Sequence, residues 1–356
     1  MGEGEQDETP RRDDPAPAVP DEAARPRRHW RQSPFLPAVV LVLIVSGAAA
    51  LFAGSYIYAM ADPTPRNVPT ALVADDDLPP QAVRRGRAFV HGMERALDSS
   101  LRLRRYDTVS QARQAVERQR AFAVLRTRPG GHVDLEVSSA SGSSVAELLT
   151  RTAPTVARQV GVEVRVRDLT PLADGDPRGL ALFYMSLAAV VTGFIGAIQM
   201  SVHAARLTPG ERIAFTAGYA TLGGLLIAVV VNNVLHAVPL PLLNSWLILA
   251  LTMFASGMVY VMFHVLAGRW AILPTWGLMV MLGNPSSGGA VSWPLLPSPL
   301  GTVGRWLPPG ASVNAHHTAV YFPEHLQVQP YLVLAGWGVV ASVVFWLRRH
   351  RHPGRA

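Results

Sequence analysis

Residues 283–322 read GNPSSGGAVSWPLLPSPLGTVGRWLPPGASVNAHHTAVYF and lie between two apolar runs, 270–282 and 331–347. Arg305 is the only charge in these forty residues apart from histidine. A long soluble loop normally carries more charge, whereas a segment that dips into a membrane protein stays apolar and buries its irregular backbone against protein. We expect a re-entrant or interfacial segment on a helical membrane domain. An ordinary apolar loop outside the membrane is the alternative.

The composition indicates a membrane protein. The chain of 356 residues is 49% apolar and 16% charged, against roughly 25% charged in an average soluble domain. It has no cysteine, which excludes disulfides and thiolate chemistry, and no lysine, so it cannot form a P-loop of its own. We therefore expect no enzyme activity and no catalytic, cofactor or metal site, and any ATP-driven work requires a second polypeptide.

The first part of the chain divides into a tail and a span. Residues 1–34 are rich in charge and proline and poor in large apolar side chains, which predicts a disordered cytoplasmic tail. Residues 35–61 contain no charge over 27 positions, enough to cross a hydrocarbon layer of roughly 30 Å. A basic cluster beside Trp30 precedes this first transmembrane span.

Residues 62–178 are polar and alternate strand-like and helix-like patterns. Strands are expected near 70–74, 101–106, 121–127, 132–138 and 162–168, with helices near 77–98, 108–119 and 144–160. Ser144 and Glu147 have the spacing of a capping box at the start of the last helix. The order βαβαββαβ predicts a mainly parallel sheet in an extracytoplasmic α/β domain inserted between the first and second spans.

Residues 179–347 predict a five-span membrane domain, giving an α-helical polytopic protein with six spans in all. Uncharged runs cover 179–205, 213–237, 242–267 and 331–347, and the run 270–283 is too short to cross alone and continues into the segment 283–322. Arginine occurs in the amino tail, the turn 206–212, Arg269 and the basic tail 348–356. The positive-inside rule therefore places both termini in the cytoplasm of a plasma-membrane protein.

Few polar residues fall inside the predicted spans. Because no Asp, Glu or Arg lies deep in these runs, the sequence argues against ion-coupled secondary transport. Asn232, Asn233 and His236 are candidates for lining a path, and interhelical hydrogen bonding or plain interfacial placement is the alternative that the sequence favours. His316, His317 and His325 suggest zinc only weakly, because neighbouring side chains diverge, and we interpret them as loop histidines near the lipid interface.

Short motifs over residues 35–347 resemble the permease subunits of type-2 ABC exporters, in particular the phage-infection-protein-like branch. The motifs are VPTALVAD at 68–75, SQARQAV at 110–116 before FAVL at 122–125, GNPSSGG at 283–289 and LPPG at 307–310. The order of one span, an external α/β insert and five spans with a broken segment before the last is also similar. The chain departs from the family in its weak amino-terminal interface helix, which Pro26 interrupts.

The resemblance implies a permease that moves an amphiphilic or lipid-like substrate outward. A separate ATPase subunit would power it, and pairing as a homodimer or with a related permease would enclose the substrate path in the lipid bilayer, with no nucleic-acid partner. The implied ATPase contact is Arg206, Leu207, Thr208, Pro209, Gly210, Glu211 and Arg212, and the expected outer gate is Asn284, Pro285, Gly288, Gly289, Pro308, Pro309 and Gly310. The alternative function is a non-transporting membrane receptor or envelope-assembly scaffold whose ectodomain binds a partner.

Overall fold

The computed structural model describes residues 35–61, 65–73, 78–98 and 101–351, together with residues 2 and 63. By internal contacts the chain divides into two units, Met1–Ala50 and Leu51–Ala356. The first unit contributes the start of the apolar helix α1 (Leu36–Met60), whose last ten residues belong to the second unit. The predicted tail 1–34 with its basic cluster and residues 352–356 of the carboxyl tail lie outside the described residues.

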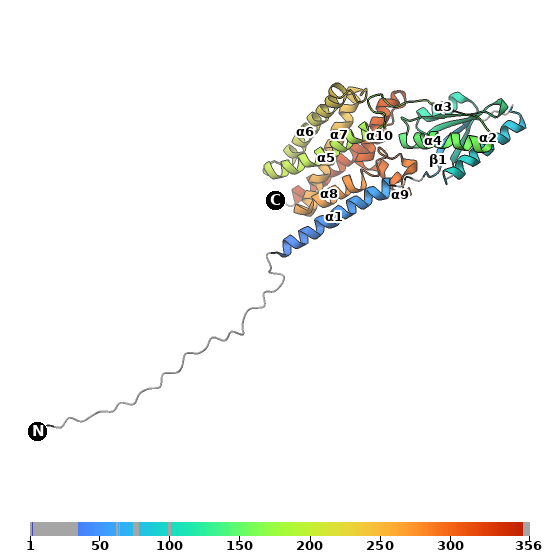
Figure 1. Cartoon of the computed structure of the whole chain (residues 1–356). Coiled ribbons are helices and arrows are strands. Elements are labelled where there is room, and N and C mark those ends of the chain that lie inside the picture. The colour runs from blue at the N-terminus through green and yellow to red at the C-terminus, as the bar shows by residue number, and fades with distance from the viewer. Residues whose placement is uncertain are drawn as a thin grey trace. The chain divides into compact units, whose positions relative to one another are not determined.

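Five strands form one mixed sheet in the order β2-β1-β3-β4-β5 (Figure 1). Only β3 and β4 pair antiparallel; the other three neighbouring pairs are parallel, as the strand and helix order predicts. The strands are β1 (Val68–Val73), β2 (Leu101–Tyr106), β3 (Ala123–Thr127), β4 (Val133–Val137) and β5 (Val164–Asp168), and the one-turn helix η2 (Pro129–Gly131) joins β3 to β4.

Three helices cover the two faces of this sheet. α2 (Pro80–Ala96) and α4 (Ser143–Val160) pack together over a core that includes Phe89, Leu125 and Leu149. α3 (Val109–Glu117) contributes Ala112 and Val116 to a separate cluster with β1 and β3. We call residues 65–178 the α/β region.

The rest of the second unit is helical. Its elements up to the quoted segment are α5 (Ala181–His203), α6 (Pro209–Val229), η3 (Val230–Val234), α7 (Leu242–Ala267), η4 (Gly268–Trp270), α8 (Ile272–Trp276) and η5 (Gly277–Leu282). In the described chain, five helices are long and apolar enough to cross a membrane, namely Leu36–Met60, Ala181–His203, Pro209–Val234, Leu242–Trp270 and Gln329–His350. Ile272–Leu282 is shorter, as its sequence predicts, so the count of six spans is not confirmed.

Residues 283–322 do not form an ordinary loop. They contain η6 (Trp293–Leu295), α9 (Ser298–Val303), η7 (Gly304–Trp306) and α10 (Pro308–Tyr321), and η8 (Pro323–His325) leads into α11 (Gln329–Arg351). Eleven of the fourteen residues of α10 are buried, because this helix packs against α5, α7 and α11. The apolar composition of the segment therefore reflects burial against protein.

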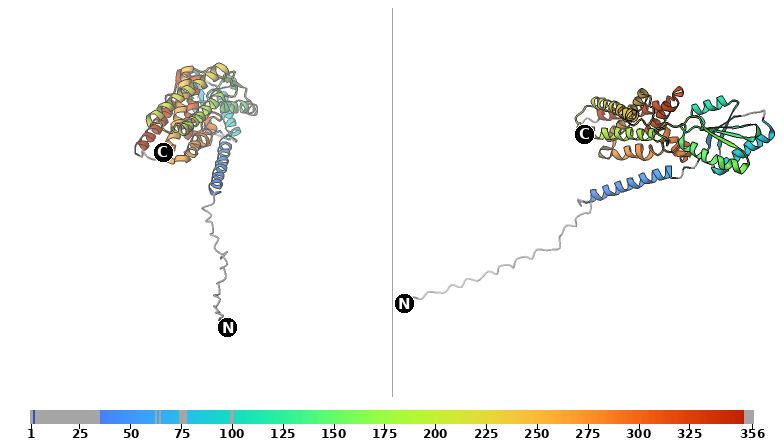
Figure 2. Two further views of the ribbon diagram at one scale, coloured as in Figure 1. Left: turned by 90° about the vertical axis from the view of Figure 1, so that its left-hand side faces the viewer. Right: turned by 45° about the horizontal axis from the view of Figure 1, so that its top comes forward.

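Within the second unit, the α/β region lies at one end of the helices and the chain's carboxyl end at the other (Figure 2). At the carboxyl-end side, Gly210 of the α5–α6 turn lies beside the Trp346 ring of α11. At the α/β side, Asp176 accepts hydrogen bonds from the backbone N–H groups of Leu180 and Ala181 (2.9 and 2.8 Å). This buried carboxylate stabilises the positive amino-terminal end of α5. We call the two ends the α/β end and the far end.

Candidate functional site

The α/β region is joined to the segment 283–322 by hydrogen bonds that the sequence did not reveal. The hydroxyl of Ser144 bonds the hydroxyl of Ser292 (2.8 Å) and accepts from the Ser292 N–H (2.9 Å), and the Arg66 N–H donates to the Pro294 carbonyl (2.8 Å). The predicted capping box at Ser144 is therefore wrong: Gly142 precedes α4 without a side-chain cap, and Ser144 bonds the distant segment instead.

The same segment also completes the hydrophobic core of the α/β region. Val291, Leu295 and Leu296 are buried in one cluster with the α2 and α4 side chains and the sheet. Trp293 and Leu300 pack against that cluster. Covering apolar surface in this way contributes roughly 25 cal/mol per Å², so separating the segment from the α/β region would be costly.

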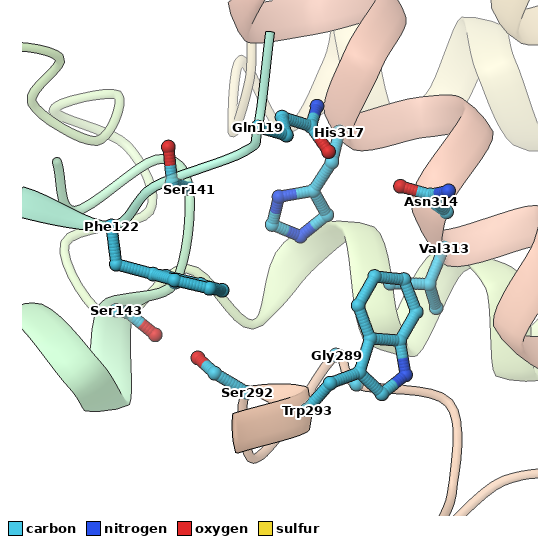
Figure 3. A pocket seen from close by; sticks show the side chains of 12 residues that line it. Gln119, Phe122, Ser141, Ser143, Gly289, Ser292, Trp293, Val313, Asn314 and His317 are labelled. Carbon is cyan, nitrogen blue, oxygen red and sulfur yellow. The ribbon is translucent and has the colours of Figure 1, made fainter. Parts of the chain in front are cut away.

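A small cavity of about 20 Å³ with a mixed polar and apolar lining lies at this junction (Figure 3). The rings of Phe122, Trp293 and His317 border it, together with serine hydroxyls and side-chain amides. Gln119 donates from Nε2 to the Thr318 hydroxyl beside it (3.2 Å). A volume of this size holds about one water molecule, so the cavity suits a bridging water better than an organic ligand.

The sequence predicts that His316 and His317 are loop histidines near the lipid interface, and this prediction is wrong, because both lie in α10. His316 is fully buried in α10, where its Nδ1 donates to the Ser312 carbonyl (2.8 Å), and burial lowers the pKa of its imidazole from 6.5 to about 4. Nδ1 of His317 donates to the Ala140 carbonyl of the α/β region (3.2 Å), and burial also lowers the pKa of His317. No cluster of potential metal ligands occurs among the described residues, and His325 lies apart in η8.

The residues of the expected outer gate come together, because backbone segments approach closely there. A Cβ on Gly304 would lie 1.7 Å from the Ser286 carbonyl oxygen, and one on Gly310 would lie 2.1 Å from the Gly304 carbonyl oxygen. Gly283 contacts the Pro309 ring in the same way. The motifs 283–289 and 307–310 are thereby packed against each other. Of the predicted gate residues Gly288 is half-buried, and the other six are buried, namely Asn284, Pro285, Gly289, Pro308, Pro309 and Gly310.

Two further contacts hold this packed segment. Asn284 is hydrogen-bonded to the hydroxyl of Tyr56 near the end of α1 (2.5 Å). The guanidinium of Arg305 lies over the Trp293 ring at 4.5 Å from its centre, which is the distance of a cation–π interaction. Whether the segment gates a path stays a prediction.

The α5–α6 turn is a rigid surface feature. Thr208 and Glu211 form a capping box: the Glu211 N–H donates to the Thr208 hydroxyl (3.3 Å), and the Thr208 N–H donates to the Glu211 carboxylate (2.8 Å). The T-x-x-E spacing of 208–211 is a direct sequence signal for this cap that the sequence analysis overlooked. Arg206, Thr208, Gly210 and Glu211 are exposed, and Leu207 and Pro209 are half-buried.

Arg212 differs from its neighbours because it points into the protein. It is only 7% exposed, and its guanidinium donates to the Ser201 hydroxyl (2.9 Å) and the Ala204 carbonyl (3.1 Å) at the end of α5. The residue therefore holds the two helices of the turn together. Arg212 is therefore the one residue of the predicted ATPase contact, 206–212, that a partner cannot reach.

Asn232 and Asn233 lie in η3, and His236 follows two residues after it. The Leu240 N–H donates to Oδ1 of Asn232 (3.0 Å), and Nδ2 of Asn232 donates to Oδ1 of Asn233 (3.1 Å). Asn232 thus stabilises the turn between η3 and α7. Asn233 and His236 are exposed, and a path-lining role for them stays a prediction.

Comparison with known proteins gives no match: no protein-family model fits the chain, and no curated protein or solved structure is similar to it. The fold itself defines the class of protein. Five helices long and apolar enough to cross a bilayer, with a small α/β sheet, indicate a multi-pass membrane protein.

Proposed function

We propose that this chain is the permease subunit of an ABC-type exporter, which moves an amphiphilic or lipid-like substrate outward using ATP hydrolysed by a separate subunit. The observation that carries the proposal is the α5–α6 turn. It exposes charged and polar groups of Arg206, Thr208 and Glu211 on a backbone locked by a capping box and by buried Arg212. A stiff, charged turn between two membrane helices can transmit the movement of a docked partner to both helices.

The proposed topology has six crossings with both termini in the cytoplasm. The far end, which carries Arg206, Arg269 and Arg348, is the cytoplasmic end, in agreement with the positive-inside rule. The fifth crossing combines the short helix 272–282 with the start of the segment 283–322, and the α/β region is extracytoplasmic. Two such subunits form the transport path between them, with the segment 283–322 gating its outer end.

The test is affinity purification of the tagged full-length protein from its native membranes, followed by identification of any bound ATPase. We expect Arg206→Glu to reduce ATPase recovery, because reversing an exposed charge at the rim of an interface disfavours docking. Arg269→Glu is the matched control, since it makes the same charge change at an exposed site outside the turn. Equal recovery with both variants would remove the turn as the contact.

The alternative, a receptor or scaffold, is favoured by one observation. A groove of about 480 Å³ lies between α2 and the strands β1 to β3, lined by apolar side chains and by charged or polar groups that include Arg87, His91, Glu94 and Arg105. Such mixed linings suit small ligands or peptide side chains. Purification without any ATPase would favour this function, and a ligand search on the groove would then follow.

A further inference from the structure

A stripe of small polar side chains runs along α7 where it faces α5 and α10. Ser245, Thr252 and Ser256 are spaced by seven and four residues, which places them on one face of the helix. Ser186 of α5 and Ser312 and His316 of α10 are also fully buried. We call Ser186, Ser245, Thr252, Ser256, Ser312 and His316 the polar seam.

Part of the polar seam is hydrogen-bonded across three helices. The hydroxyls of Thr252 and Ser312 are 2.9 Å apart, and those of Ser312 and Ser186 are 3.1 Å apart. His316 donates from Nδ1 to the Ser312 carbonyl. Because a carbonyl only accepts, the neutral ring carries its hydrogen on Nδ1 and presents Nε2 as an acceptor.

The remaining groups of the polar seam lack a hydrogen bond of normal geometry, although the backbone of Ser245 interacts with the His316 ring and raises the pKa of that ring. Among the described residues, the helical part contains five buried side-chain atoms without a hydrogen bond, and all five lie on α7 and α10: Ser245 Oγ, Ser256 Oγ, His264 Nδ1, His316 Nε2 and His317 Nε2. Burying a polar atom without a partner costs about 1–3 kcal/mol. Three such atoms along one seam call for a ligand that can both donate and accept.

The two serines also differ from other hydroxyls in the membrane helices. Helical Ser and Thr side chains commonly donate to the carbonyl four residues earlier, which removes the need for another partner. Thr192, Thr216, Thr252 and Thr275 all do so, at 2.6–2.7 Å. Ser245 and Ser256 make no such bond, so their hydroxyls remain available to something that lies between the helices.

We propose that the polar seam is a water-binding path inside a single subunit, and that its waters complete the hydrogen bonds of Ser245, Ser256 and His316. Water fits because it both donates and accepts, so it can satisfy a serine hydroxyl in either role and the acceptor nitrogen of His316. Ser245 lies in the first turn of α7 and is the seam residue of α7 nearest to the α/β end. Ser256 lies fourteen residues from Leu242 along α7, so water there reaches about 21 Å into the helices.

This inference goes beyond transport by paired subunits. The sequence argues against ion-coupled secondary transport, because the uncharged runs contain no Asp, Glu or Arg. The structure instead brings a histidine and two serines from other elements against α7, from α10 and α5. The seam therefore offers a water-binding path into one subunit, whether or not an ATPase binds.

The absence of native cysteine permits a direct test on the purified full-length protein. Single variants Ser245→Cys and Ser256→Cys are nearly isosteric and place a thiol in the seam. Silver ion is small enough to enter a water path, and it reacts with thiols that water can ionise. After exposure to silver ion the protein is denatured, and the thiol that has not reacted with silver is measured by labelling with a maleimide.

Ala255→Cys is the matched control, because Ala255 is equally buried but lies about 100° around the helix from Ser256. Thr302→Cys is the exposed reference. We expect both seam cysteines to react at least about tenfold faster than A255C, approaching T302C, because reaction requires a hydrated thiolate. If a seam variant is not monodisperse, Ser312→Cys replaces it with the same expectation. If either seam cysteine reacts as slowly as A255C, the polar seam is dry and the proposal is wrong.

Discussion

Replacing Gly310 by alanine tests how closely the segment 283–322 packs on itself. A Cβ at this position would lie 2.1 Å from the Gly304 carbonyl oxygen and 2.8 Å from the Gly304 carbonyl carbon. Both atoms belong to backbone, which cannot rotate away as a flexible side chain could. The start of α10 must therefore move away from η7 to admit one methyl group.

The expected destabilisation follows from two opposing effects. Overpacking a tight core costs typically 1–3 kcal/mol, and a backbone clash of this size belongs at the upper limit. Alanine recovers up to about 1 kcal/mol in a helix. The net loss is about 2 kcal/mol, which corresponds to a fall in the melting temperature of about 3 °C for a chain of 356 residues.

The assay is thermal unfolding of the detergent-purified protein, followed by tryptophan fluorescence, since Trp306 belongs to η7 with Gly304 and Trp293 donates to the Ser286 carbonyl that Gly304 packs against. Gly336→Ala in α11 is the control, because no atom lies within 4 Å of its added Cβ. It should leave the melting temperature unchanged or raise it slightly. An unchanged melting temperature for G310A would refute the close packing of η7 against α10.

Three further predictions follow from the same contacts. Burial holds the pKa of His316 near 4 in the folded state, whereas the unfolded pKa is 6.5, so the unfolded state binds a proton first as the pH falls. The folded state should therefore lose about 1.4 kcal/mol of stability per pH unit below pH 6.5. Thermal melts across pH 7 to 5 should show a smaller loss in His316→Gln than in wild type or in the exposed-site control His203→Gln. Ser312→Ala should cost about 1–3 kcal/mol by stranding the Ser186 hydroxyl, since Thr252 keeps its bond to the Ile248 carbonyl, whereas Ser186→Ala and Ser312→Ala combined should cost less, so equal melting temperatures for the single and double variants would contradict this account. Residues 65–176 expressed alone should show helix and strand by circular dichroism but bind an apolar dye, because Val291, Leu295 and Leu296 no longer cover their core; a disordered spectrum, or a folded domain without dye binding, would be evidence against it.

The sequence alone determined the local elements of this protein. The apolar runs predict the long helices because a bilayer-spanning helix needs about twenty apolar residues, whatever its neighbours are. Alternating strands and helices predict the mainly parallel sheet, since a crossover helix imposes parallel pairing. The sequence also predicts the break at 238–241 between two apolar runs and the short helix after Arg269, because prolines, charges and the length of an apolar run affect the chain where they occur.

The contacts between distant elements required the tertiary structure. Ser144 has the spacing of a cap, yet it bonds Ser292, because the α/β region and the segment 283–322 meet only in three dimensions. Arg212 looks like an exposed turn residue, but the close approach of α5 and α6 buries it. His316 lies in a Gly- and Pro-rich stretch that resembles a surface loop, and only the packing of α10 against α5 and α7 places it in the core. Local patterns specify which face of an element is apolar, whereas burial of a polar side chain depends on what that face meets.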